Sequence, residues 1–162
     1  MNSEVTFESV SEYPGNVTGT SIVIRMLDGL GYRFRYATQE LSREDYRFTP
    51  GKGCKTIGET MRHIWWLMDI ICRAIFGEND TPAGDVESRR RHTLEMILKL
   101  RMHFNSISDT EFSQIKLGVY PFWHIINGPI SDALTHTGQI NTLRRLAGNP
   151  TVESDVFLMK KP

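Results

Sequence analysis

Apolar residues recur at spacings of three and four in three segments of the 162-residue chain, and this pattern constrains the fold more than any other feature. Such spacing gathers apolar side chains on one face of an α-helix. It predicts helices over about 18–41, 56–77 and 86–107, each buried along one face. The predicted buried positions are Val23, Leu27, Leu30, Phe34, Ala37, Leu41, Ile57, Met61, Ile64, Met68, Ile71, Ile75, Leu94, Ile97, Leu100, Phe104 and Ile107.

Signals at the helix ends agree with this pattern. Residues 56–59 form a capping box, in which a threonine and a glutamate satisfy each other's backbone N–H groups, and Gly77 stands where a left-handed cap would end the helix. Gly29 and Gly31 lie inside the first predicted helix, where each costs about 1 kcal/mol relative to alanine. We therefore expect either that a neighbour packs closely against them or that the helix bends there.

A fourth apolar-rich segment runs over 122–147 and ends at a Gly-Asn-Pro stop signal. Pro129 either kinks a helix that begins near Phe122 or occupies the first turn of one that begins near Gly128, and we favour the kink.

The remaining segments are predicted to connect these helices. We expect connectors at 42–55 and 108–121, each long enough to cross an end of the molecule, and a polar turn at 78–85. Residues 151–162 are expected to be extended and weakly fixed. No segment has a convincing strand pattern, so the sequence predicts an all-α four-helix bundle, one domain over 1–162 with its core at about 18–150.

Composition excludes several classes of protein. Nineteen Lys and Arg balance nineteen Asp and Glu, so no net field attracts a polyanion, and nucleic acid is not an expected partner. The basic run at 89–91 is accordingly expected to be a solvated helix face. Cys54 and Cys72 lack the CxxC spacing of a zinc ribbon or redox dithiol. With no signal peptide at the start and no membrane span, we expect a soluble, cytoplasmic protein.

Asp132 and His136 are the first candidates for chemistry. Their i, i+4 spacing places both on one face of the fourth predicted helix. At about 100° per residue they lie in the same angular sector of the helix as four other residues, most of them apolar. A carboxylate that faces a core is costly unless it is paired or binds a metal. The other members of that sector are Ile125, Gln139, Leu143 and Leu146.

His63 is the first candidate for a third ligand, because it flanks the apolar stripe of the second predicted helix. Two histidines and one carboxylate suit Zn(II), Fe(II) or Ni(II) with open coordination positions. The spacing of Asp132 and His136 alone favours the plainer alternative, a hydrogen-bonded Asp–His pair.

The remaining reactive and aromatic side chains are assigned simpler roles. His124 could line a pocket mouth, although a capping or surface position is favoured, and His92 and His103 are expected at the surface. Cys72 is expected to be buried and inert, and Cys54 exposed without being a nucleophile. Trp65, Trp66 and Trp123 could form an aromatic wall, although core or dimer-interface positions are favoured.

Two stretches of the sequence resemble the DinB-like (DinB/YfiT) superfamily. Residues 56–64 are similar to its second helix. Residues 132–140 and 143–148 resemble its H-x-x-x-H-x-G-Q-[IVL] signature and closing Leu-Arg-Gly run. The resemblance spans about 18–150. It implies a four-helix bundle, commonly a homodimer, with one divalent metal ion held by His63, Asp132 and His136.

The same resemblance implies a class of activity. The superfamily includes metal-dependent transferases and isomerases that act on low-molecular-weight thiols such as bacillithiol and mycothiol, and also members with no known activity. Asp132 stands where histidine is usual, and Thr137 where arginine often follows. The carboxylate-x-x-x-His pair resembles the mycothiol-dependent maleylpyruvate isomerase branch, which uses the longer glutamate.

Two hypotheses for function follow. The first is a divalent-metal-binding hydrolase, or an S-transferase or isomerase for low-molecular-weight thiols, with a small-molecule or thiol substrate. The second is a metal-free, non-catalytic dimeric bundle whose degenerate site binds a small ligand or serves a structural or stress-related role.

Overall fold

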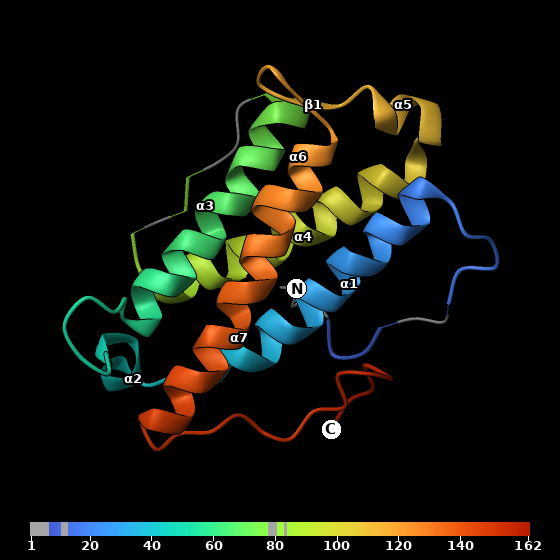
Figure 1. The fold of residues 1–162 in the computed structure, drawn as a ribbon. Helices are drawn as coiled ribbons and strands as arrows, with labels where there is room; N and C mark the ends of the chain where they lie inside the picture. The colour runs from blue at the N-terminus through green and yellow to red at the C-terminus, as the bar shows by residue number, and fades with distance from the viewer. Residues whose placement is uncertain (1–6, 11–12, 78–80, 83) are drawn as a thin grey trace.

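The computed structural model describes residues 7–10, 13–77, 81–82 and 84–162 (Figure 1). Most of these residues lie in four long helices that surround one apolar core, and two of the helices, α1 and α3, each pack against both of the others, α4 and α7. The fold class is therefore all-α, as predicted. The long helices are α1 (Gly19–Thr38), α3 (Ile57–Phe76), α4 (Val86–Ser106) and α7 (Ser131–Leu146).

The apolar stripes predicted for the first three helices form this core. Every predicted stripe residue inside α1, α3 and α4 is buried except Ile75, which is partly buried. Leu41 and Ile107 lie just beyond the helix ends and are also partly buried. Full burial of a Leu, Ile or Phe side chain stabilises a fold by roughly 1.5–3 kcal/mol, so the stripes account for how these helices face one another.

The predicted helix ends are confirmed. Thr56 Oγ1 accepts from the N–H of Glu59 at 3.1 Å, and Glu59 Oε2 accepts from the N–H of Thr56 at 2.9 Å. Gly77 ends α3 with φ 82°. At Gly31 a neighbour packs closely, because an added Cβ would lie 2.6 Å from the ring of Phe7.

Helix α1 is capped at both ends by side chains from distant parts of the chain. The carboxylate of Asp109 accepts from the N–H groups of Gly19 and Thr20, each at 2.9 Å. At the other end the Arg144 guanidinium reaches the last carbonyls of α1 and the chain just after them. Its Nη1 donates to the carbonyl oxygens of Tyr36, Ala37 and Gln39 at 3.3, 3.2 and 2.9 Å.

Helices α3 and α4 run in the same direction. Trp65 contacts His92 early in both helices, and Phe76 contacts His103 near both C-terminal ends. Gly77 and Val86 therefore lie near opposite ends of α3 (Figure 1). The predicted polar turn at 78–85 lies partly outside the described residues, at 78–80 and 83.

The two predicted connectors contain short elements. The first holds α2 (Arg43–Arg47), and the second holds α5 (Asp109–Ser113) and a hairpin of β1 (Lys116–Leu117) and β2 (Tyr120–Pro121). A serine precedes each short helix, and its hydroxyl oxygen accepts from the backbone N–H of an acidic residue three positions later. That capping signal was present in the sequence, but no long apolar stripe accompanied it.

The fourth segment forms one helical run from α6 (Trp123–Ile125) through the π-helical turn η1 (Ile126–Ile130) into α7. It begins near Phe122, as predicted. Pro129 lies within the π-helical turn and has no N–H to donate. The Ser131 N–H instead reaches the carbonyl of Ile126, five residues earlier.

This π-helical turn changes which face of α7 is buried. A π turn holds more residues than an α turn, so counting about 100° per residue across it assigns the wrong face. The predicted stripe is accordingly wrong for α7, where Gln139 and Leu146 are exposed and Leu143 is only partly buried. The buried residues of α7 are Ala133, Thr137, Ile140 and Arg144.

The C-terminal tail is fixed more firmly than predicted. Met159 is buried beside Tyr32 and Tyr36 of α1, and its carbonyl accepts from the N–H of Val10 at 2.9 Å. The Tyr32 hydroxyl donates to the carbonyl of Lys160 at 2.5 Å. The expectation of a weakly fixed tail is wrong because one apolar side chain and these hydrogen bonds hold it to α1 and to the segment that contains Val10.

The basic run at 89–91 is also not wholly solvated, because Arg90 is buried. Its Nε donates to Thr38 Oγ1 at 2.9 Å, and its Nη1 donates to Glu87 Oε1 at 3.0 Å. Among the described residues, no helix combines the length and apolar character needed to cross a membrane.

Candidate metal centre

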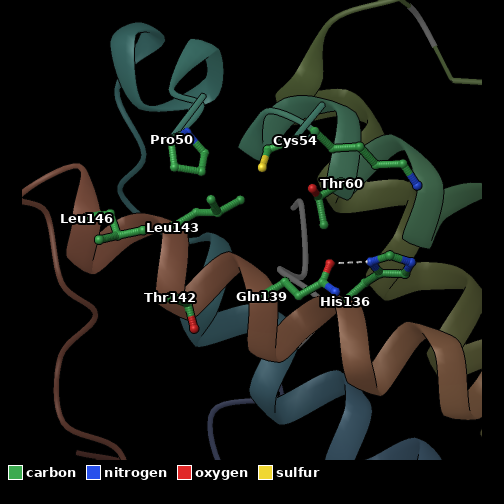
Figure 2. Close-up of a pocket in the computed structure, with 9 residues that line it drawn as sticks. Pro50, Cys54, Thr60, His136, Gln139, Thr142, Leu143 and Leu146 are labelled. Atoms are coloured by element: carbon green, nitrogen blue, oxygen red, sulfur yellow. Dashed lines mark hydrogen bonds between the residues drawn. The ribbon is translucent and has the colours of Figure 1, made fainter. Parts of the chain in front are cut away.

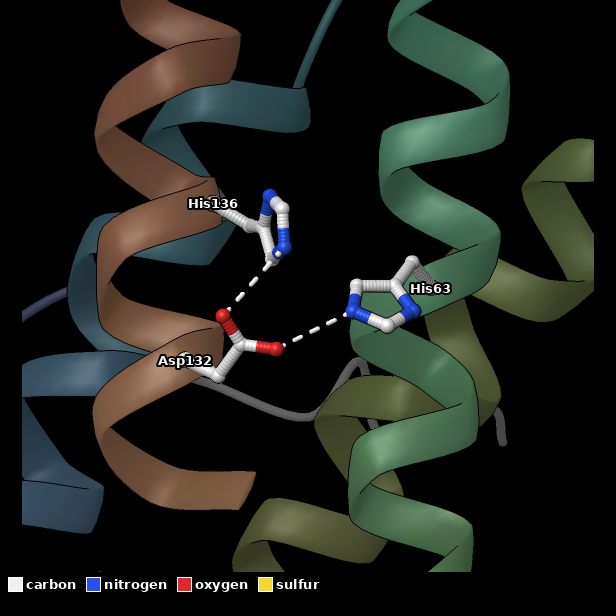
Figure 3. A group of neighbouring side chains, drawn as sticks. All are labelled: His63, Asp132 and His136. Atoms are coloured by element: carbon white, nitrogen blue, oxygen red, sulfur yellow. Dashed lines mark hydrogen bonds and ion pairs between the residues drawn. The ribbon is translucent and has the colours of Figure 1, made fainter. Parts of the chain in front are cut away.

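The structure brings His63, Asp132 and His136 together between α3 and α7 (Figure 3). His63 lies on the second turn of α3, shortly after the capping box, and Asp132 and His136 lie on successive turns of α7. Each residue offers one ligand atom, and these atoms all lie within 4.8 Å of one another.

Asp132 bridges the two histidines. Its Oδ2 lies 3.0 Å from His63 Nε2, and its Oδ1 lies 3.4 Å from His136 Nε2. The side chains of His63, Asp132 and His136 are 25%, 43% and 13% exposed. The carboxylate thus faces a half-open site and not the core, which corrects the expectation drawn from the helix sector.

Gln139 orients His136. The Nδ1 atom of His136 lies 2.7 Å from Gln139 Oε1 (Figure 2). An amide oxygen can only accept, so Nδ1 carries a proton, and in the neutral tautomer with that proton Nε2 presents a lone pair to Asp132. Two acceptors then face each other across 3.4 Å, an arrangement that a cation between them stabilises.

The arrangement fits a transition-metal ion. Zinc lies about 2.0–2.2 Å from nitrogen and carboxylate ligands, so two ligand atoms on one tetrahedral ion are roughly 3.4 Å apart. The separation of 3.4 Å between Asp132 Oδ1 and His136 Nε2 matches that value, and the 3.0 Å between Asp132 Oδ2 and His63 Nε2 is slightly shorter. A histidine ligand whose second nitrogen donates to a carbonyl oxygen is the usual arrangement in metal sites, and Gln139 provides it for His136.

Trp66 forms one wall beside His63. The two rings stack with centroids 5.7 Å apart and an interplanar angle of 21°. This contact restricts the orientation of His63, while Trp66 itself stays exposed. The position corrects the expectation of a core role, and the dimer-interface alternative for Trp66 stays a prediction.

Each of the three candidate ligands lines a different hollow. His136 and Gln139 line a pocket of about 410 Å³ with Thr60 (Figure 2). His63 lines a second hollow of about 320 Å³, and Asp132 lines a third of about 470 Å³. The centre is therefore accessible from several sides.

The larger of the two hollows that contain histidine has chemically distinct walls. Pro50, Leu143 and Leu146 make an apolar wall, while Lys55 supplies a positive charge. Cys54 is exposed and lines the same pocket, as Figure 2 shows. The sequence predicted the exposure of Cys54 but not its position beside His136.

Cys72 and the other histidines lie away from this centre. Burial raises the pKa of the Cys72 thiol to about 12, which confirms an inert side chain. His124 is exposed against Tyr120, as favoured from the sequence. His92 is not a free surface residue, because its Nδ1 accepts from Trp65 Nε1 at 2.9 Å. His103 is likewise partly covered by Phe76.

The sequence analysis missed the roles of Gln139 and Lys55, and it gave an aromatic wall that includes Trp66 only as the less favoured alternative. Gln139 could have been found from its place one helical turn after His136, where a side-chain oxygen can reach the imidazole. Trp66 follows His63 by three residues in the same way. Lys55 lies before the helix, so no periodic signal connects it to the centre.

Comparison of the chain with protein-family models, with curated proteins and with solved structures found no match. Function is therefore inferred from the side chains that meet between α3 and α7, and from the hollows beside them.

Proposed function

We propose that this chain is a DinB-like four-helix-bundle protein that binds one divalent metal ion, Zn, Ni or Fe, through His63, Asp132 and His136. We propose further that it is a metal-dependent hydrolase, or an S-transferase or isomerase for low-molecular-weight thiols. The observation that carries the metal site is the orientation of His136. Its Nδ1 is held by Gln139, so its Nε2 points at the carboxylate that also contacts His63.

A divalent ion bound there would supply Lewis acidity, which lowers the pKa of a thiol or water brought to it. The residues around the centre would position the substrate. Pro50, Leu143 and Leu146 exclude water from one wall of the pocket beside His136, and Lys55 attracts a negatively charged substrate group. The hollow beside Asp132 leaves room for the reacting group to approach the carboxylate.

A metal-free alternative has one observation in its favour. His63 Nε2 and Asp132 Oδ2 already form a 3.0 Å hydrogen bond, which satisfies both groups when the histidine nitrogen carries a proton. In this alternative the protein is a non-catalytic bundle, and the pocket beside His136 binds a small ligand or has a structural role.

Metal titration distinguishes the two proposals. Chelator-treated protein is titrated with Zn(II), Ni(II), Mn(II) and Fe(II) by calorimetry, together with His63→Ala and the matched control His124→Ala, which removes an exposed histidine outside the centre. We expect near-stoichiometric binding that His63→Ala weakens by at least about 100-fold and His124→Ala leaves unchanged. Absence of binding by the wild-type protein, or equal affinity in His63→Ala, would favour the metal-free bundle.

Activity and assembly are tested separately. The metal-loaded protein is screened with low-molecular-weight thiols and electrophilic acceptors and with hydrolysable esters and amides, using His136→Ala as the inactive control. We also propose a homodimer, which light scattering of the eluting protein would show as twice the chain mass of 18.6 kDa.

A further inference from the structure

Four arginines surround a hollow of about 360 Å³ where α2 and the first turns of α3 and α4 meet. Arg43 and Arg47 come from α2, Arg62 from α3 and Arg89 from α4. We call this hollow the arginine pocket. Its lining holds one carboxylate, that of Glu59, which is turned back onto the N–H and hydroxyl of Thr56 in the capping box. Four positive charges thus face one negative charge in a chain with no net charge.

These four arginines differ from others in the molecule. Arg35, Arg73, Arg90 and Arg101 each form an ion pair with a carboxylate. Within the described part of the chain, none of the four pocket arginines has a carboxylate oxygen within 4.0 Å. Guanidinium groups that converge without acidic partners are typical of sites that bind phosphate or carboxylate.

Arg89 supports this interpretation independently. Its Nε is buried, yet within the described residues it has no hydrogen-bond partner. The guanidinium lies over the ring of Trp65, 5.8 Å from its centroid, which restricts its position. A buried N–H donor without an acceptor costs roughly 1–3 kcal/mol, so Arg89 lines the pocket with hydrogen-bonding capacity that the described residues leave unused.

The pocket owes its shape to a close approach of α2 and α3. A Cβ at Gly58 would lie 3.0 Å from the carbonyl oxygen of Tyr46, so glycine keeps α2 close to the start of α3. Gly58 also lines the pocket in the first turn of a long helix, where backbone N–H groups and the helix dipole favour negative charge. These features add to the four guanidinium groups and to the buried Nε of Arg89.

We propose that the arginine pocket binds the phosphate or diphosphate group of a small molecule. A volume of about 360 Å³ suits a small ligand, and the neutral chain lacks the extended positive surface that a polynucleotide needs. Arg62 and Glu59 also line the neighbouring hollow that contains His63. A molecule anchored by its phosphate in the arginine pocket therefore extends toward His63, but phosphate binding itself requires no metal ion.

Calorimetric titration of chelator-treated protein with inorganic pyrophosphate tests the proposal. Three variants accompany the wild-type protein: Arg47→Gln/Arg89→Gln in the pocket, Arg91→Gln/Arg145→Gln as a control with the same net charge, and His136→Ala in the candidate metal centre. Arg91 and Arg145 are exposed and do not line the arginine pocket.

We expect saturable binding with one pyrophosphate per chain. The pocket variant should weaken it by at least about tenfold, while the control pair and His136→Ala change it by less than about twofold. Binding should also shift the side-chain Nε–H resonance of Arg89 in the wild-type protein. Absence of saturable binding, or equal weakening by the control pair, would overturn the proposal. Loss of binding in His136→Ala would also overturn it, by placing the anion at the candidate metal centre.

Discussion

Helix α7 carries two polar sites along its length, and they use their hydrogen-bonding groups in opposite ways. Near its C-terminal end Arg144 is 3% exposed, and its guanidinium donates to the end of α1 and to Asn149. Near its N-terminal end Asp132 and His136 are partly exposed, and His136 Nε2 faces a carboxylate oxygen. The polar groups of the first site are engaged within the protein, whereas the second holds a partly exposed carboxylate between two histidine nitrogens.

This difference indicates what each site is for. Because the Arg144 hydrogen bonds join α7 to the end of α1, they stabilise the fold and leave little capacity for a ligand. Asp132 and His136 add little to that packing, since hollows adjoin them. We therefore expect substitutions at the first site to change stability and substitutions at the second to change binding.

Arg144→Met should have the largest effect. It removes the donors for the carbonyls of Tyr36, Ala37 and Gln39, and we expect the free energy of unfolding to fall by about 3 kcal/mol. Urea denaturation at pH 7 measures this change. Arg145→Met is the matched control, since Arg145 is exposed and should matter by less than about 0.5 kcal/mol. If both variants lose the same free energy of unfolding, the buried Arg144 stabilises the fold no more than the exposed Arg145 does.

His136→Ala should give the opposite result. We expect metal affinity to fall by at least about 100-fold, equivalent to about 2.7 kcal/mol, because one of three ligands is lost. The free energy of unfolding of the metal-free protein should change by less than about 1 kcal/mol, because the side chain borders a hollow. Calorimetry and urea denaturation measure the two quantities. A variant that unfolds would make this site structural, like that of Arg144.

Gln139→Leu should have a smaller effect on the same site. It leaves all three ligands in place but removes the acceptor for His136 Nδ1, so we expect metal affinity to fall by about tenfold. Gln139→Glu keeps an acceptor at that position and is expected to retain affinity close to that of the wild-type protein. If both variants bind metal equally well, Gln139 does not orient the ligand.

The smallest effect is expected at the exposed cap on the other end of α1. Hydrogen bonds from the N–H groups of Thr20 and Gly19 hold the pKa of Asp109 below its usual 3.8. A pKa lowered in the folded state means that the ionised carboxylate stabilises the fold above pH 3.8 and that this contribution disappears as the pH falls through the folded-state pKa.

Asp109→Asn should therefore lower Tm at pH 7, by less than Arg144→Met does, and the difference from the wild-type protein should vanish at strongly acidic pH. Thermal denaturation followed by circular dichroism across pH 2–7 tests this prediction. A difference that persists unchanged at the acidic end would show that charge on Asp109 is not what stabilises the cap.

Much of the fold could be predicted from the sequence, because burial repeats with the period of a helix. The stripes in α1, α3 and α4 are confirmed, and the three candidate ligands do meet. The common direction of α3 and α4 could not be predicted, because an apolar stripe indicates which face is buried and not which way a neighbour runs. The cap by Arg144 depends on that three-dimensional arrangement, as does the contact between Arg90 and Thr38.

The candidate site was predicted only in part for a related reason. His63 was selected from its place beside a stripe, which the structure supports, since it lies 3.0 Å from Asp132. The surroundings of Asp132 were misjudged, because a constant rotation per residue was carried through Pro129 into α7. The arginine pocket draws on three helices, and no local pattern in the sequence joins Arg43 to Arg89.

The π-helical turn at Ile126–Ile130 makes the site sensitive to the length of the chain as well as to its composition. Removing one residue there would let an ordinary α-helix form and would rotate the rest of α7 by about 100° about its axis. His63, Asp132 and His136 would all still be encoded, yet the last two would no longer face α3. Among related chains, a one-codon deletion in this turn could therefore abolish the site while every ligand is conserved.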